Sequence, residues 1–299
     1  MNKIMPATLI SGVAIAATIR DEISIEVSRL KDQHSLIPGL VTILVGDDPA
    51  SQSYVRAKNA TARVLGIHSQ QITLPAHTSE SELLQLVHTC NRDSVFHGIL
   101  VQLPLPSHIN EANILFAISP EKDVDGFHPV NVGKLMLGEP CLLPCTPQGI
   151  LELLERTNIS TSGAEVVIVG RSNIVGKPIA NLMLQKRPGG NATVTVCHTR
   201  TRDMAFHTRR ADILIVAAGV ANMIKAEHIK EGAVVIDVGV NRIGQTAGGK
   251  AILAGDVDFA DVVNKAGSIT PVPGGVGPMT ITMLMKNTVQ AAKQAVGLL

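Results

Sequence analysis

Short apolar runs alternate with segments of helical periodicity along most of the chain. In the first half, the runs at residues 39–46 and 98–104 are almost continuously apolar, which is typical of strands buried on both faces of a parallel sheet. Other strands are predicted at 70–75, 165–170, 192–197, 212–219 and 233–239. Strands that alternate with helices in this way predict an α/β fold with two domains and largely parallel sheets.

The helices between these strands have recognisable periods and caps. Near the start of the chain, Ile15, Ile19, Ile23 and Val27 recur at i+4 steps with charged residues between them, which indicates an amphipathic helix. Ser79 and Glu82 have the spacing of a capping box. Further helices are predicted around Tyr54 and Lys58 as far as Gly66, at 110–118, at 148–158, at 176–184 and from Met279 onward.

Proline and glycine mark the breaks in this pattern. Residues 140–147 have the character of a linker, and residues 187–190 that of a turn. The loop at 270–278 contains Gly274, Gly275 and Gly277, which allow a close backbone approach to a ligand or unusual φ values. The prolines in the same loop stiffen it.

Composition narrows the class of function. The chain has 299 residues, 45% of them hydrophobic, and a net charge of +1, so nothing marks it as a nucleic-acid binder. Its cysteines form no CxxC pair, which predicts reduced thiols and no zinc site. Ser11, Gly12 and Thr18 interrupt the apolar run near the N-terminus, and no segment is long enough to span a membrane. We therefore expect a cytoplasmic protein without metal, membrane or nucleic-acid partners.

The first candidate for chemistry is the pair formed by Tyr54, the only tyrosine, and Lys58. In a helix these residues share a face because they are four positions apart, and Ser51 joins that face from three positions earlier. Spacing alone also fits a surface helix with a solvated lysine. The same Tyr-x-x-x-Lys pair is the signature of short-chain dehydrogenases, but there it follows the glycine-rich loop, whereas here it precedes it by more than a hundred residues.

A second candidate is the glycine loop that follows the strand at 165–170. Gly170 and Gly176 flank a turn between a buried strand and a helix, where a pyrophosphate binds in doubly wound folds. A phosphate-binding P-loop is excluded because the two glycines are one residue too far apart and Pro178 replaces the required Ser or Thr.

The residues after the next strand favour NADP over NAD. An NAD site usually has an acidic residue there for the ribose hydroxyls, but Thr199, Arg200 and Arg202 occupy this segment, and no acid precedes Asp203. Together with Arg171, they supply the cations and hydroxyls that suit a 2′-phosphate.

Four motifs in order carry a resemblance over essentially the whole chain. They are GILVQLPLP from Gly98, PEKDVDGFHP from Pro120, GRSNIVGKP from Gly170 and PVPGGVGPMT from Pro271. With the Tyr/Lys helix, they make the chain closely similar to the bifunctional methylenetetrahydrofolate dehydrogenase/cyclohydrolase family.

The resemblance implies a role for each matching residue. Lys58 is the central catalytic group, Gln102 assists it, Tyr54 stacks on the folate, Asp125 hydrogen-bonds the pterin and Ser51 lies near the lysine. We expect Asp123, by contrast, to serve only the turn and the helix cap. The expected substrate loop contains Pro273, Gly274 and Gly275, and the expected NADP contacts are Gly170, Arg171, Ser172, Thr199, where the family often has Ser, and the backbone of Val240.

The resemblance also implies a domain arrangement, and the sequence departs from the family pattern at two places. The arrangement is a folate-binding catalytic domain at 1–144 and a Rossmann-type NADP domain at 145–299, with a cleft between them. The last helix, at about 279–297, is expected to pack back on the first domain, and the protein is expected to be a homodimer. Val13 stands where the family commonly has lysine, and the turn at 187–190 is longer than in many members. Neither is expected to touch the site. The alternatives are a dehydrogenase without cyclohydrolase activity and a non-catalytic NADP-binding sensor.

Overall fold

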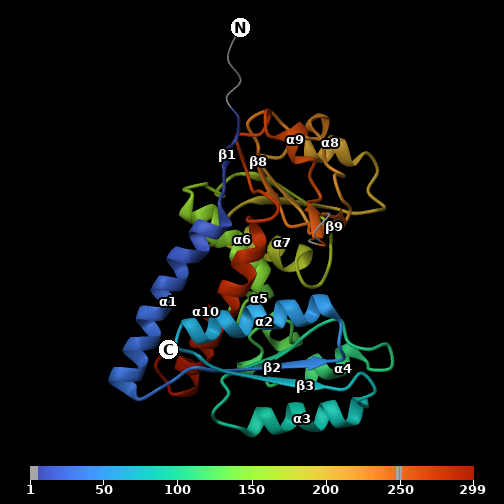
Figure 1. Ribbon diagram of the computed structural model, residues 1–299. Helices are drawn as coiled ribbons and strands as arrows, with labels where there is room; N and C mark the ends of the chain where they lie inside the picture. The colour runs from blue at the N-terminus through green and yellow to red at the C-terminus, as the bar shows by residue number, and fades with distance from the viewer. Residues whose placement is uncertain (1–5, 247–248, 250) are drawn as a thin grey trace. The chain divides into compact units, whose positions relative to one another are not determined.

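The computed structural model describes residues 6–246, 249 and 251–299, which fold into two compact units (Figure 1). The three-stranded unit contains Ala17–Cys145 and Ile281–Leu299. The six-stranded unit contains the described residues as far as Ala16, together with Thr146–Thr280. Helices α1 (Gly12–His34) and α10 (Val276–Ala295) each begin in the six-stranded unit and continue in the other.

The three-stranded unit is built on a parallel sheet in the order β3-β2-β4. Its strands are β2 (Gly39–Val45), β3 (His68–Leu74) and β4 (Gly98–Val101). All residues of β2 and β4 are buried, which confirms the prediction from their unbroken apolar sequence. Helices α2 (Pro49–Val64) and α3 (Glu80–Arg92) cover opposite faces of the sheet, as Figure 1 shows.

Some ends of these helices and strands agree with the boundaries predicted from the sequence, and others differ from them. The capping box is present: the Ser79 hydroxyl accepts the Glu82 N–H, and the Glu82 carboxylate accepts the Ser79 N–H. Strand β4 ends at Val101, earlier than predicted, because Pro104 has no N–H to offer a ladder. Strand β3 begins two residues before the predicted strand.

The segment after β4 contains one predicted helix and one that the pattern did not predict. Helix α4 (Glu111–Ala117) is capped by the Asn110 side chain, as expected of a helix at 110–118. A short 3-10 helix (Pro120–Lys122) precedes α5 (Pro129–Leu137). Helix α5 escaped prediction because several of its apolar residues are exposed and leave no clear 3.6-residue stripe.

The six-stranded unit contains a sheet in the order β1-β11-β8-β7-β5-β6, with every pair parallel. The predicted strands are β5 (Glu165–Val169), β6 (Thr193–Cys197), β7 (Ile213–Val216) and β8 (Val234–Asp237). The chain's first strand, β1 (Thr8–Leu9), pairs with β11 (Ser268–Ile269), and both are too short to show a pattern. An antiparallel pair, β9 (Asn241–Gln245) and β10 (Ala251–Ala254), was also not predicted.

Helix α6 (Cys145–Arg156) precedes β5. The helices that follow strands of this unit are α7 (Gly176–Leu184), α8 (Met204–Thr208), α9 (Phe259–Val262) and a 3-10 turn at Ala226–His228. Helix α6 begins at Cys145, so the predicted linker at 140–147 is wrong at its end. Helix α10 likewise begins at Val276 rather than Met279, because a proline at 278 fits the first turn of a helix, where its missing N–H has no partner to lose.

Helices α1 and α10 of the three-stranded unit are joined by an ion pair. Glu26 on α1 is 2.9 Å from Nζ of Lys293 on α10 and 2.8 Å from Nε of Arg29. Hydrogen bonds from Arg29 and Lys293 lower the pKa of Glu26 to about 2. Folding favours the ionised form of Glu26, so the ion pair stabilises the fold at pH values above the ordinary pKa of glutamate. This contribution to stability is lost as the pH falls toward about 2.

We therefore predict that Glu26→Gln lowers the free energy of unfolding by about 1 kcal/mol near neutral pH and by less as the pH falls. Urea unfolding of both proteins between about pH 6 and pH 3 measures the difference. Asp21→Asn, an exposed change on the same helix, is the matched control. A difference between Glu26→Gln and the parent that stays constant over this range would contradict the prediction.

Candidate active site

Helix α2 carries the first group of candidate residues, and its N-terminus is firmly capped. The Asp48 carboxylate accepts the N–H of Ser51 at 2.7 Å, and Pro49 occupies the first turn. Hydrogen bonds from the backbone and the side chain of Ser51 lower the pKa of Asp48. Ser51 is therefore buried at the start of the helix, with Asp48 as its partner.

Asn59, the neighbour of Lys58, attaches α2 to the sheet. Its Oδ1 accepts hydrogen bonds from the hydroxyls of Thr42 on β2 and Ser69 on β3, and its Nδ2 donates to Gln71 Oε1 at 3.2 Å. Asn59 is 4% exposed. Sequence reasoning missed this residue. The feature of the sequence that could have indicated it is its position four residues after Val55, which places this polar residue on the buried face of the helix.

Lys58 and Gln102 come together from different elements. Lys58 Nζ donates to Gln102 Oε1 at 3.0 Å, and Gln102 Nε2 donates to the Leu103 carbonyl at 2.7 Å. The backbone of Gln102 extends the β4 ladder, since its N–H donates to Ile43 O. Both side chains are half-buried. A neutral amide thus holds the lysine through its carbonyl oxygen, without a carboxylate's negative charge.

Asp125 is electrostatically coupled to the same lysine. Burial raises the pKa of Asp125, while the positive charge of Lys58 acts to lower it and the neighbouring Asp123 raises it further. A hydrogen bond to Cys145 also favours the ionised carboxylate. Lys58 and Gln102 are in direct contact and Asp125 is coupled to Lys58 through its charge, so we call these three predicted residues the lysine site.

The loop that carries Asp125 is held from several directions. Asp123, 2% exposed, accepts the N–H of His128 at 2.8 Å and Nδ2 of Asn131 at 2.9 Å, which confirms its expected structural role. Asn287 on α10 donates to the carbonyls of Val124 and Leu143, both at 2.8 Å. These bonds fix the backbone on both sides of Asp125.

The other residues predicted to bind substrate lie outside this cluster. Tyr54 is 52% exposed on α2, with its ring available to a ligand. Pro273, Gly274 and Gly275 belong to the six-stranded unit, where they precede α10. There the Gly274 carbonyl accepts the N–H of Val13 at 3.1 Å. The expectation that Val13 does not touch a site residue is therefore wrong, because the start of α1 packs on this loop.

The glycine loop of the six-stranded unit has the compact backbone predicted for it. Gly170 has φ +125°, and a Cβ there would overlap the Ala217 carbonyl at the end of β7. A Cβ on Gly176 would overlap the Gly170 carbonyl. The Ser172 hydroxyl accepts the N–H of Val175 at 3.1 Å and caps the turn into α7. Both positions therefore require glycine, because the loop packs tightly on itself and against the residue after β7.

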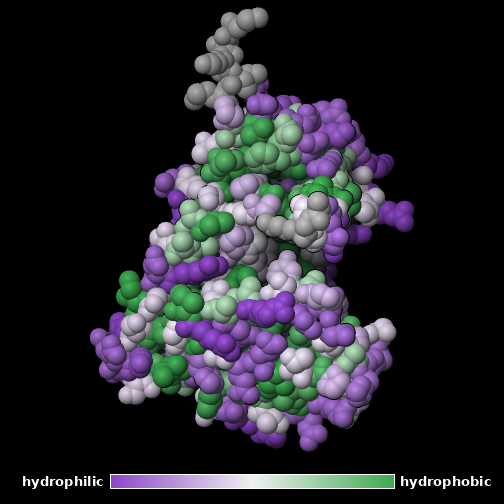
Figure 2. Space-filling view, in the orientation of Figure 1, coloured by the Kyte–Doolittle hydropathy of each residue, from purple (hydrophilic) through white to green (hydrophobic). Residues whose placement is uncertain are grey.

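Exposed cations and hydroxyls surround the end of the neighbouring strand. Arg171 lies in the glycine loop, and Thr199 and Arg200 directly follow β6; all three are exposed. Hydrophilic residues dominate the surface around α8 in Figure 2. Val240, 50% exposed, follows β8. These residues are free to contact a ligand at the carboxyl edge of the sheet, and they fit a phosphorylated dinucleotide.

Two buried carboxylates close to this edge were not predicted. Asp237 ends β8 and Asp256 follows β10, and they are 3% and 0% exposed. Burial raises the pKa of Asp237 to about 6, although the N–H groups of Val257, Asp256 and Gly239 favour its ionised form. The feature of the sequence that could have indicated this pair is an acidic residue, Asp237, at the end of an apolar strand.

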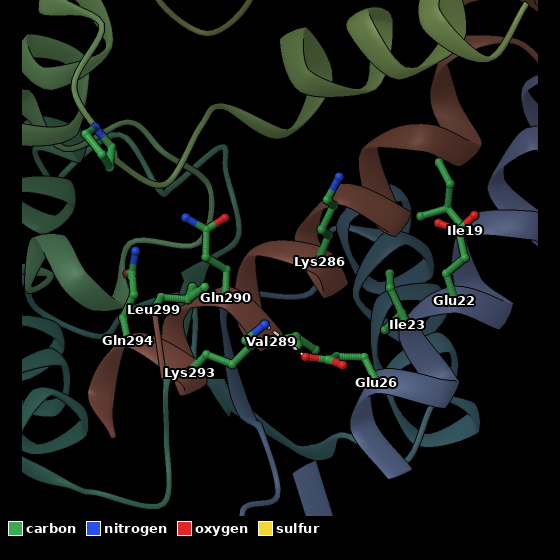
Figure 3. Close-up of a pocket in the computed structure, with 11 residues that line it drawn as sticks. Ile19, Glu22, Ile23, Glu26, Lys286, Val289, Gln290, Lys293, Gln294 and Leu299 are labelled. Atoms are coloured by element: carbon green, nitrogen blue, oxygen red, sulfur yellow. Dashed lines mark ion pairs between the residues drawn. The ribbon is translucent and has the colours of Figure 1, made fainter. Parts of the chain in front are cut away.

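One cavity lies away from all the candidate residues. It has a volume of about 490 Å³ and is bordered by α1, α10 and the last residue, Leu299 (Figure 3). The Glu26–Lys293 ion pair crosses it. Among the described residues, no group of three or more His, Cys, Asp or Glu side chains is placed to hold a metal ion, and no helix has the length and apolarity that a membrane span requires.

A parallel sheet with a glycine-flanked loop between a strand and a helix at its carboxyl edge is typical of dinucleotide-binding α/β proteins. The particular family follows from sequence comparison. The family model for the NAD(P)-binding domain of tetrahydrofolate dehydrogenase/cyclohydrolase matches residues 144–296, and that for the catalytic domain matches 10–125. The chain belongs to the tetrahydrofolate dehydrogenase/cyclohydrolase family, which confirms the resemblance inferred from the motifs.

Individual relatives extend over nearly the whole chain. The bifunctional protein FolD of Syntrophobacter fumaroxidans is 65% identical over 289 residues, which cover 97% of this chain and 98% of the relative. That of Syntrophus aciditrophicus is 64% identical over 294 residues, or 98% of this chain and 100% of the relative.

Two solved structures of the family are also similar to this chain over nearly its whole length. The bifunctional FolD enzyme of Campylobacter jejuni is 48% identical with a TM-score of 0.90 and covers 97% of this chain and 99% of its own. The Trypanosoma brucei dehydrogenase-cyclohydrolase, solved with NADP cofactor and inhibitor, is 40% identical with a TM-score of 0.92 and covers 98% of this chain and 99% of its own.

We predict that Asn59→Leu lowers the free energy of unfolding by about 2–3 kcal/mol, because it leaves the buried hydroxyl of Thr42 and the partly buried hydroxyl of Ser69 without their acceptor. Urea unfolding measures the loss. The control is Gln52→Ala on the same helix, whose amide makes only a long, exposed bond of 3.4 Å to Asp47 O. Equal stability of the two variants would refute the anchoring role of Asn59.

Proposed function

We propose that this protein oxidises 5,10-methylenetetrahydrofolate with NADP and hydrolyses the resulting 5,10-methenyltetrahydrofolate to 10-formyltetrahydrofolate. The observation that carries the proposal is the 3.0 Å hydrogen bond from Lys58 to Gln102, with Asp125 coupled to the same lysine, in a chain of this family. We place the protein in the cytoplasm, in keeping with four cysteines that form no disulfide, and expect a homodimer by family resemblance.

In the oxidation step, the residues of the chain mainly hold the reactants in place. Bound NADP would supply the hydride acceptor, and the lone pair of a bridging nitrogen would stabilise the methenyl cation left by loss of hydride, so no base is needed. Asp125 presents a carboxylate to the adjacent N–H donors of the pterin. The ring of Tyr54 is exposed on the same unit and stacks on the folate.

In the hydrolysis step, water adds to the methenyl carbon and the ring opens, which requires proton transfer. Lys58 is the group proposed to move the proton, and Gln102 Oε1 holds its Nζ in position. The amide is neutral and orients the amine through its carbonyl oxygen.

The cofactor site is proposed from the six-stranded unit. Gly170 and Ser172 form the turn for the pyrophosphate, and Arg171 and Thr199 meet the 2′-phosphate. Val240 contributes its backbone. Pro273, Gly274 and Gly275 are assigned to the substrate loop. What supports these assignments is the exposure of the polar side chains and the absence of room for a Cβ at Gly170.

Lys58→Met is expected to reduce cyclohydrolase turnover by about a hundredfold or more, because the proton-transferring amine is lost, while folate still binds. Absorbance of methenyltetrahydrofolate follows the hydrolysis, and equilibrium titration follows binding. Lys31→Met, an exposed change on α1, is the control. Near-normal hydrolysis by Lys58→Met would reject the assigned role. A parent enzyme that reduces NADP but does not hydrolyse methenyltetrahydrofolate would identify a dehydrogenase-only member.

Arg171→Ala is expected to raise KM for NADP by about tenfold or more and to change KM for NAD little, since a charge-assisted bond to the 2′-phosphate is removed. Initial rates with each cofactor give both constants. Lys177→Ala is the matched control, because Lys177 lies in the same loop-helix junction and its Nζ is bonded to Asn173 Oδ1 at 2.7 Å. Equal effects on NADP and NAD would rule out a 2′-phosphate contact.

A further inference from the structure

Asp237 and Asp256 hold together three loops at one edge of the six-stranded sheet. Asp256 Oδ2 accepts the N–H of Ala218 at 2.7 Å and of Gly219 at 2.8 Å, in the loop after β7. Asp237 Oδ1 accepts the N–H of Gly239 at 3.0 Å, in the loop after β8. Asp256 therefore satisfies two backbone donors of the loop after β7, and Asp237 satisfies the buried N–H of Gly239.

The two carboxylates are also linked through their own segments. Asp237 Oδ1 accepts the N–H of Asp256 at 2.9 Å, and Asp237 Oδ2 accepts that of Val257 at 2.9 Å. The segment around Asp256 is anchored in turn, because Ile224 N–H donates to Asp256 O at 3.0 Å and forms a parallel bridge with Val257. The loops are thus bonded to a fixed piece of backbone.

The packing around this pair admits no side chain on the adjoining glycines. A Cβ on Gly239 would overlap the Asp256 carboxylate, and a Cβ on Gly255 would overlap the Asp237 carboxylate. The remaining oxygen, Asp256 Oδ1, accepts Nδ2 of Asn241 at 2.8 Å. Asn241 directly follows Val240, so Asp237, through Gly239, and Asp256, through Asn241, hold the loop on the two sides of the exposed Val240.

The loops held in this way border the glycine loop. Because β5, β7 and β8 are parallel, the loops that follow them leave the sheet at the same edge. Ala217, the first residue after β7, donates its N–H to Val169 O at 2.8 Å, and its carbonyl closes the space beside Gly170. Displacement of the loop after β7 would therefore reach the pyrophosphate turn.

We propose that Asp237 and Asp256 are positioning residues for the dinucleotide: they do not touch it, but they set the loops after β7 and β8 against the glycine loop. The proposal rests on the NADP-dependent function proposed above. It predicts a defect confined to the step that needs the dinucleotide, because the lysine site lies in the three-stranded unit and hydrolysis of methenyltetrahydrofolate uses no NADP.

The test is Asp256→Ala in the full chain, assayed for both reactions. We expect KM for NADP to rise by about tenfold or more, since small displacements of a binding loop are costly, and cyclohydrolase activity to stay within about twofold of the parent. Asp256→Asn keeps one acceptor for the two N–H groups after β7 and should recover most of the NADP affinity. Unchanged KM in Asp256→Ala, or an equal loss of both activities, would overturn the proposal.

Asp258→Ala is the matched control. Asp258 lies two residues away and caps α9 by accepting the N–H of Asp261, so its loss destabilises the same segment without freeing either loop. If Asp256→Ala does not fold, Asn241→Ala replaces it: a rise of about threefold in KM for NADP with normal cyclohydrolase activity supports the proposal, and no rise refutes it. Failure of the parent enzyme to reduce NADP would instead reject the proposed function.

Discussion

Parallel pairing is the constraint on which the arrangement of this protein depends. In the six-stranded sheet every strand runs the same way, so the loops after β5, β7 and β8 leave from one edge. The glycine loop, the loop with Val240 and Asp237 are neighbours for that reason, and Asp256 joins them from the segment after β10. In the three-stranded sheet the same rule puts Gln102, at the end of β4, on the edge where β2 leads into the helix that carries Lys58.

Buried polar side chains then determine how precisely these loops are held. Asn59 bonds a helix to two strands, Asn287 bonds the backbone before Asp125 to that of Leu143, and Asp256 bonds two loops at once. Each of these groups is costly to bury without hydrogen-bond partners, and it favours a single arrangement of the backbone when all its partners are present. The exposed residues proposed to bind ligands are thus held in place by buried residues that bind no ligand.

The parts of the fold that could be predicted have strong local causes. Strand β2 is an unbroken apolar run, and α3 begins with a complete capping box. Helix α5 and strand β1 lacked such signals, because the first exposes much of its apolar surface and the second has only two residues. In the site, helical spacing related Tyr54 to Lys58, but Gln102 and Asp125 were assigned through family motifs, since no periodicity connects them to the lysine.

The amino-acid sequence by itself determined the α/β class, most strands and helices, the glycine loop and the family. These depend on side-chain type and spacing over a few residues, where the physics is local. Only the tertiary structure decided that Lys58 donates to Gln102, 44 positions away, and that Asp237 and Asp256 bond three separate loops. Such partners are chosen by burial, because a polar group removed from water must find whichever donor or acceptor the packed chain brings within reach.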